Sequence, residues 1–201
     1  MVKRKAYSAG MVKQSFWFAE FRKVVQLLTA GHSLAEIKAM NLAENIFAAP
    51  TQARATQIFN TVSLRTQALG PSFYDVFVSS DISTQKLIAL IAVMQSDSLF
   101  FDFIYEVYRE KLILGMDELA DSDVAVFFRD KQRQSEIVAK WQDYTLHRLG
   151  TCYKTLLMEA GLMARTTGSR KLLRPILTEE LEACLAENDM AAVRHALTGA
   201  R

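Results

Sequence analysis

Apolar residues recur every three or four positions along most of this chain, a spacing that predicts amphipathic helices. Ser15 is placed to cap the first helix, and Ser33 with Glu36 three residues later has the capping-box pattern for the second. Gly70-Pro71 is a clear break, because neither residue favours a helix interior. The pattern therefore predicts helices over residues 15–30, 33–40, 51–69, 72–78, 81–95, 99–114, 143–160, 179–186 and 190–198.

The helix predicted over residues 81–95 is apolar around almost its whole circumference. A helix that lacks a polar face is normally buried. We therefore expect this helix to be a central strut of the fold, with Ile91 among its interior side chains.

The stretch from Leu119 to Pro175 has a distinctive order of elements. A first helix reaches Gln134, a short helix ends at Trp141, and a long helix spans Asp143–Ala160. Two short extended segments then flank the turn-forming run Thr166–Ser169. Helix, short helix, long helix and two-stranded flap is the order of a winged helix-turn-helix, which makes this stretch a candidate nucleic-acid binder.

The long helix has a polar face opposite its apolar stripe, and the flap that follows is basic. From Tyr144 to Pro175 there are six Lys or Arg residues and one acidic residue, Glu159. Cations suit phosphates and short polar groups suit base edges. A solvated helix with a basic rim has the same pattern, so that interpretation stays open. The candidate contacts are His147, Arg148, Thr151, Lys154, Arg165, Arg170, Lys171 and Arg174.

A weaker version of the same order occurs within residues 15–69, where two helices precede a third with a polar face. That face adds Arg54 and Arg65 to the candidate nucleic-acid contacts. The loop before the third helix is long, and any three-helix bundle has this pattern. Both interpretations, DNA contact and plain bundle, remain open for this part of the chain.

The composition of the 201 residues indicates an all-α fold, because half are hydrophobic while only 3 Pro and 8 Gly occur. We expect two packed helical units, an N-terminal helical domain over residues 1–118 and a winged C-terminal domain over 119–201. The net charge of +2 says little by itself. Basic blocks at residues 1–70 and 121–175 are separated by an acidic block, which favours two anion-facing surfaces.

Little in the sequence points to catalysis. A phosphate-binding Gly-rich loop is absent, and the 2 Cys and 3 His lack metal-ligand spacing. Asp117, Glu118, Asp121 and Asp123 could hold Mg²⁺, but carboxylates before Val124 also suit a helix amino terminus. We expect no enzyme, no cofactor and no metal site. The longest apolar run is much shorter than the ~20 residues that span a bilayer, so we expect a cytoplasmic protein without a membrane partner.

Several short motifs in the chain, taken together, resemble the BrxA family of the bacteriophage exclusion (BREX) defence systems. The resemblance runs from Tyr7 to about Leu181. It rests on Ser15-Phe16-Trp17-Phe18, Glu20-Phe21, Glu44-Asn45-Ile46-Phe47, Thr84-Gln85-Lys86-Leu87, Phe100-Phe101, Tyr105-Glu106-Val107-Tyr108-Arg109-Glu110-Lys111, Asp121-Ser122-Asp123, Phe127-Phe128, Gln134-Ser135, Trp141 and Ala160-Gly161-Leu162. One departure is Trp141-Gln142-Asp143, where the family has Trp-Thr or Trp-Ser; it moves the expected helix cap to Asp143.

The resemblance implies an all-helical, two-part cytoplasmic protein that binds double-stranded DNA with little sequence preference. It also implies partners among the other proteins of a system that methylates host DNA and excludes phage. Two alternatives remain at this point. One is a helical adaptor that docks acidic proteins, and the other is an RNA-binding protein, although the long helix lacks the exposed stacking rings typical of single-strand binders.

Overall fold

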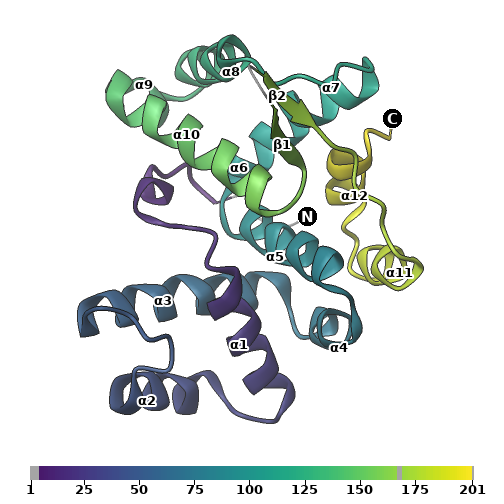
Figure 1. The fold of residues 1–201 in the computed structure, drawn as a ribbon. Helices are drawn as coiled ribbons and strands as arrows, with labels where there is room; N and C mark the ends of the chain where they lie inside the picture. Colours follow the sequence, from purple (N-terminus) through teal and green to yellow (C-terminus); the bar gives the residue numbers. More distant parts are fainter. Residues whose placement is uncertain (1–4, 167–168, 201) are drawn as a thin grey trace. The chain divides into compact units, whose positions relative to one another are not determined.

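The protein is described here by a computed structural model, which covers residues 5–166 and 169–200. The chain is mostly helical, with one short antiparallel hairpin (Figure 1), which confirms the predicted fold class. It divides into two compact units. The small unit is Trp17–Ser96, and the large unit joins the described residues of Met1–Phe16 and Asp97–Arg201.

These units differ from the predicted domains, whose boundary lay between residues 118 and 119. Side-chain packing explains the difference. Phe100 and Phe103 lie 5.0 and 5.1 Å from the ring of Tyr153, between ring centroids, so the helix that carries them belongs with the C-terminal elements. The first residues of the chain also join the large unit, where Arg148 donates a hydrogen bond to the Val12 carbonyl.

The small unit consists of five helices in the described residues, of which α3 contacts α1, α2 and α5. The capping box of Ser33 and Glu36 is present at the start of α2, as predicted. The prediction for Ser15 was wrong: Trp17 is the N-cap residue of the first helix, with a left-handed backbone (φ 51°) and no side-chain capping bond. The helices are α1 Phe18–Thr29, α2 Leu34–Glu44, α3 Gln52–Leu69, α4 Ser72–Ser79 and α5 Ile82–Ser96.

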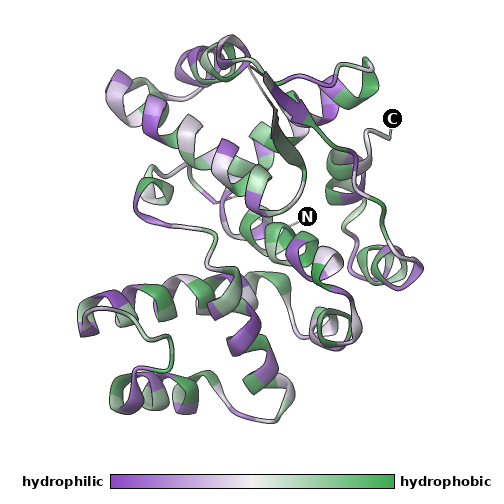
Figure 2. Cartoon of the chain, in the orientation of Figure 1, coloured by the Kyte–Doolittle hydropathy of each residue, from purple (hydrophilic) through white to green (hydrophobic). Residues whose placement is uncertain are grey.

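Helix α5 is the apolar centre of the small unit. Its side chains are buried from Leu87 through Met94, and Ile91 is completely inaccessible. Figure 2 colours α5 mostly green and white. Because the helix has no polar face to turn to water, burial on all sides is the arrangement that its sequence allows.

The large unit begins with the 3₁₀ turn η1 (Gly10–Lys13) and continues after Asp97, which caps the next helix by accepting from the Phe100 amide. The single helix predicted over 99–114 is interrupted by a π-helical segment. Helices α8, α9 and α10 then lead into the hairpin in the predicted order (Figure 1). The elements are α6 Ser98–Phe103, η2 Ile104–Tyr108, α7 Arg109–Ile113, α8 Asp121–Gln134, α9 Glu136–Ala139, α10 Asp143–Glu159, β1 Met163–Thr166, β2 Ser169–Leu172, α11 Glu179–Glu187 and α12 Ala191–Thr198.

The hairpin is anchored to the chain segment that precedes α8. β1 and β2 pair antiparallel, with Met163 opposite Leu172. On the other edge of β2, the Leu119 amide donates to the Arg170 carbonyl at 3.1 Å and the Leu172 amide donates to the Asp117 carbonyl at 2.6 Å. The start of α8 is therefore fixed directly beside the hairpin.

Candidate nucleic-acid interface

Helix α10 presents the two faces that its sequence predicts. It begins at Asp143, with Gln142 as N-cap residue, so the expectation that Asp143 is the cap was wrong by one residue; Ala160 follows as its C-cap. Leu149, Tyr153 and Leu157 are fully buried. The opposite side of the helix is polar and solvent-exposed, so it is available for contact with another molecule. His147, Arg148 and Thr151 are exposed there.

Two of the predicted cations, Lys154 of α10 and Arg170 of β2, meet at a single carboxylate. The Lys154 ammonium lies 2.6 Å and an Arg170 guanidinium nitrogen lies 2.7 Å from the same Asp121 oxygen. The side chains of Lys154 and Arg170 are 15% and 33% exposed, while that of Asp121 is 69% exposed. The carboxylate thus lies on the solvent side of the two cations.

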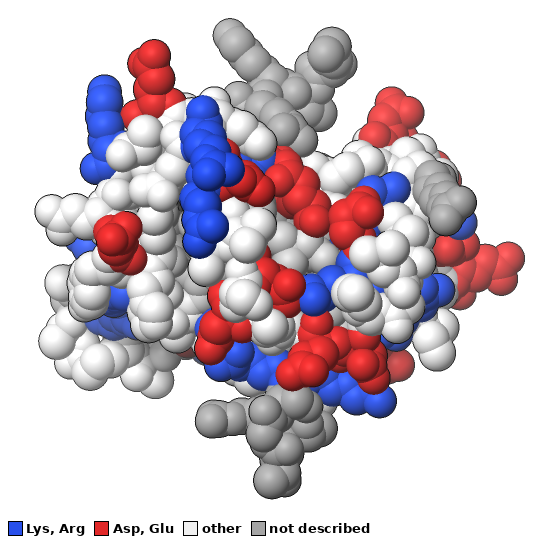
Figure 3. Space-filling view, turned by 90° about the horizontal axis from the view of Figure 1, so that it is seen from above, with Lys and Arg blue, Asp and Glu red and all other residues white. Residues whose placement is uncertain are grey.

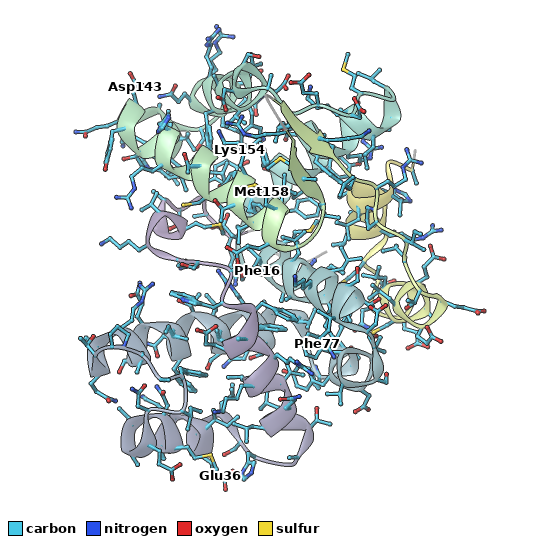
Figure 4. The ribbon with its side chains drawn as sticks, in the orientation of Figure 1. Phe16, Glu36, Phe77, Asp143, Lys154 and Met158 are labelled. Carbon is cyan, nitrogen blue, oxygen red and sulfur yellow. The ribbon has the colours of Figure 1, made fainter. Side chains whose placement is uncertain are left out.

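These contacts stabilise the ionised form of Asp121. Hydrogen bonds from Lys154 and then from Arg170 lower its pKa to about 2. Figure 4 labels Lys154 on α10, the residue that donates to the Asp121 carboxylate at the start of α8.

The other predicted cations each have a different partner. Lys171 lies 3.2 Å from a carboxylate oxygen of Asp117, so it is partly neutralised. Arg148 donates to the Val12 carbonyl at 3.1 Å, and Arg174 donates to the Leu112 carbonyl at 3.1 Å. Because a carbonyl carries no net charge, these two arginines keep theirs.

The remaining predicted contacts of the large unit are polar or fall outside the described residues. Thr151 donates its hydroxyl hydrogen to the His147 carbonyl within α10. Arg165 belongs to strand β1, but its side chain and the turn at Gly168 lie outside the part of the chain that the structure describes.

A groove of about 370 Å³ runs between α8 and α10, next to the Asp121 contacts. Its floor is apolar, and Gly150 sets its depth: a Cβ at this glycine would lie 2.6 Å from a methyl carbon of Val124. The absence of a side chain at Gly150 therefore lets the two helices approach closely. The groove is lined by Asp121, Val124, Ala125, Phe128, Arg129, Gln132, Asp143, Leu146, His147, Gly150 and Lys154.

The predicted contacts of the small unit are placed differently, and the expectation of an exposed Arg65 was wrong. Arg65 is 2% exposed, and its guanidinium carbon lies 5.9 Å from the centre of the Trp17 ring. Arg54 is half-buried over the same ring at 4.9 Å and donates to the Gln57 side chain at 2.9 Å. Thr61 on the same helix is also buried. The polar face of α3 is therefore part of a packed interior.

Three of the acidic residues before and within the first turn of α8, Asp117, Asp121 and Asp123, have individual partners. Asp123 accepts from the Ala120 amide at 2.7 Å and lies 2.8 Å from the Lys111 ammonium. Asp117 and Asp121 have the partners given above. No group of three or more His, Cys, Asp or Glu side chains within residues 5–166 and 169–200 is arranged to hold a metal ion.

A buried polar cluster in the large unit was missed by sequence reasoning. Lys131 is 3% exposed and lies 3.3 Å from Asp102 and 2.5 Å from Glu106. Tyr7 donates its hydroxyl hydrogen to the same Asp102 carboxylate. The sequence carried one signal for this cluster, because Lys131 follows Phe127 and Phe128 at the helical spacing of the apolar stripe.

Charges of both signs lie on one face of the molecule. On the face seen in Figure 3, blue and red side chains alternate rather than gathering into one basic patch. An anion site on that face would thus be built from a few cations rather than from a large positive field.

These elements define a mostly helical protein whose larger unit contains the order helix, short helix, long helix and hairpin, followed by α11 and α12. The chain belongs to the BrxA family, whose model matches residues 5–189, and this confirms the resemblance. It is 37% identical over 177 residues to "BREX protein BrxA" of Bacillus cereus (strain H3081.97), with 88% of each chain covered.

A solved structure shares the fold. The crystal structure of an uncharacterized protein from Magnetospirillum magneticum matches with a TM-score of 0.80 and 18% sequence identity, over 98% of this chain and 100% of that one. At this identity the likeness concerns the fold alone.

In the described chain, no single helix is both long enough and apolar enough to span a membrane. Only α5 and the stretch Ser98–Ile113, taken together as a bent pair, meet the length and composition requirement.

Proposed function

We propose that this BrxA-family chain is a component of a BREX phage-defence system and binds double-stranded DNA there without catalysing a reaction. The single observation that carries the DNA-binding part is the exposed polar face of α10 beside a basic hairpin, with Lys154 and Arg170 brought to one point. In this proposal α8, α9, α10 and the hairpin act as a winged helix-turn-helix, with α10 against the duplex.

Charge supports phosphates as the main contact. Arg148 lies on the exposed face of α10 and keeps its full charge, because it contacts the Val12 carbonyl and the Tyr144 ring, neither of which carries a net charge. Thr151 lies about one turn further along the same face, and its hydroxyl can donate to a phosphate oxygen if it gives up its bond to the His147 carbonyl. These side chains recognise the backbone of a duplex rather than its sequence.

Weak sequence preference follows from what α10 lacks. Bidentate reading of adenine uses Asn or Gln, and neither occurs from Asp143 to Glu159. The proposed role is thus a non-specific DNA contact in an assembly, with the other proteins of the BREX system as further partners.

The test is binding of the purified chain to a labelled duplex at several salt concentrations, with duplex RNA and single strands for comparison. Each phosphate neutralised contributes about −0.9 to the slope of log K against log salt. We expect a slope between about −2 and −4, for roughly three or four contacts, and similar affinities for unrelated duplex sequences. A flat salt dependence, or stronger binding to RNA, would rule the proposal out.

A further inference from the structure

The ion pair of Lys154 and Arg170 with Asp121 is arranged like an occupied anion site. Both cations approach the same carboxylate oxygen, at 2.6 and 2.7 Å, and the second Arg170 nitrogen lies 3.5 Å from the other oxygen. The three side chains come from α8, α10 and β2, and the backbone bonds at 117–119 fix the hairpin beside α8. The positions of the two cations are thus set by the fold.

The solvent exposure of the three side chains indicates which of them can move away from the other two. Lys154 is largely covered by protein and Arg170 is two-thirds covered, whereas Asp121 is mostly in water. Exposed ion pairs contribute little to stability. Moving the carboxylate aside therefore disturbs the fold little, and it uncovers two cations that already point at one oxygen.

We propose that Lys154 and Arg170 form a phosphate-binding site, and that Asp121 is its internal ligand, which a DNA phosphate must displace. This inference rests on the proposed function, since it names the place where the duplex backbone makes one of its contacts. A phosphate oxygen accepts hydrogen bonds from an ammonium and a guanidinium in the way that the Asp121 oxygen does.

The carboxylate has two effects on binding. It reduces the charge of the site from two positive charges to one, and it competes directly with the incoming phosphate. Asp121 therefore weakens DNA binding, and its removal strengthens it. A residue with only a structural role would have the opposite or no effect on affinity.

The experiment compares Asp121→Asn with Asp130→Asn in the full chain. Both changes remove one negative charge from α8, but Asp130 pairs with Arg133 at 3.4 Å rather than with the two site cations. We expect Asp121→Asn to bind duplex DNA roughly three- to tenfold tighter at low salt, with a salt slope steeper by about 0.9. Asp130→Asn should leave the slope unchanged.

A second variant tests whether the gain in affinity depends on the two site cations. Adding Lys154→Gln to Asp121→Asn should remove the gain, because one of the two donors is then missing. Competition with inorganic phosphate shows whether the site binds any phosphate group or needs an extended DNA backbone. Inorganic phosphate should displace DNA from Asp121→Asn at a lower concentration than from the unaltered chain.

The outcomes separate this inference from the proposed function. Wild-type binding to DNA with no gain in Asp121→Asn, or an equal gain in Asp130→Asn, overturns the phosphate site and leaves the proposed function standing. Failure of both the unaltered chain and Asp121→Asn to bind any duplex overturns the two together.

Discussion

Helices α10 and α3 are the two long helices whose sequences predict a polar face for nucleic acid. In the structure this face is exposed on α10 and buried on α3. On α10 the polar side chains His147, Arg148 and Thr151 are exposed. On α3 the corresponding residues Thr61 and Arg65 are buried. The same pattern of polar residues therefore serves a surface in the large unit and an interior in the small one.

The difference in exposure between the two helices comes from the side chains that pack against them. Trp17 precedes α1 and places its ring within 4.9 Å of the Arg54 guanidinium carbon and 5.9 Å of that of Arg65. An aromatic face can accept a guanidinium, and the aliphatic stem of Arg packs as an apolar side chain. The polar face of a helix thus stays exposed to solvent only where no aromatic ring or other packing partner covers it.

The largest expected effect concerns the apolar centre of the small unit. Ile91→Asp places a carboxylate in a fully buried position of α5, where it finds no partner. An unpaired buried charge costs several kcal/mol against a total stability of about 5–15 kcal/mol. We expect aggregation or an unfolded small unit by circular dichroism; a soluble variant with an unchanged melting temperature would contradict the burial of α5.

The next effect tests the comparison directly, with the same substitution on both helices. Arg65→Ala should lower the free energy of unfolding by roughly 2–4 kcal/mol, because a packed side chain is removed. Arg148→Ala, on the exposed face of α10, should change it by about 0.5 kcal/mol or less. Denaturant titration of both variants measures the contrast, and equal losses would show that the two faces are equivalent.

A smaller effect is expected where α8 and α10 approach each other. Gly150→Val introduces a side chain whose first carbon would lie 2.6 Å from Val124, and such overpacking costs about 1–3 kcal/mol. The neighbouring change Thr151→Val serves as control and should stay within about 0.5 kcal/mol, since position 151 is exposed. Similar melting temperatures for the two variants would contradict the close helix approach.

The smallest effect is the titration of Asp121. Its pKa in the folded chain is about 2, below its ordinary value of 3.8. A lowered carboxyl pKa stabilises the fold above the ordinary value, and this contribution is lost as the pH falls through about 2. Since the side chain is 69% exposed, the contribution should stay below about 1 kcal/mol.

Carbon-detected NMR of the Asp121 carboxyl group measures this midpoint. In Lys154→Gln the pKa of Asp121 should move up toward 3.8, because the hydrogen bond from Lys154, the largest cause of the lowered pKa, is gone. A midpoint near 3.8 in the unaltered chain would show that the ion pairs do not persist in solution.

Most of the fold was accessible from the sequence because local patterns determine it. The capping box at Ser33, the apolar circumference of α5 and the order from α8 to the hairpin were each predicted and found. The unit boundary was not, because it depends on contacts between distant residues such as Phe100 and Tyr153.

The candidate site was predictable only in part. Sequence periodicity placed His147 and Arg148 on the exposed face of α10, where they lie. It could not show that Asp121, 33 residues before Lys154, forms ion pairs with that lysine and with Arg170. Nor could it show that Arg65 is buried against a ring 48 positions earlier in the chain, since ring and guanidinium meet only after the helices pack.

The proposed function places the DNA contact on the α10 face and the hairpin of the large unit rather than on α3. Its most direct measurement is the salt slope of duplex binding for two variants that each lose two positive charges. Arg148→Gln with Lys171→Gln should reduce the magnitude of the slope by about 1.8. Lys38 is an exposed residue of α2, and Lys38→Gln together with Arg54→Gln on α3 should leave the slope unchanged. An unchanged slope in the first variant, or an equal reduction in the second, would contradict the claim.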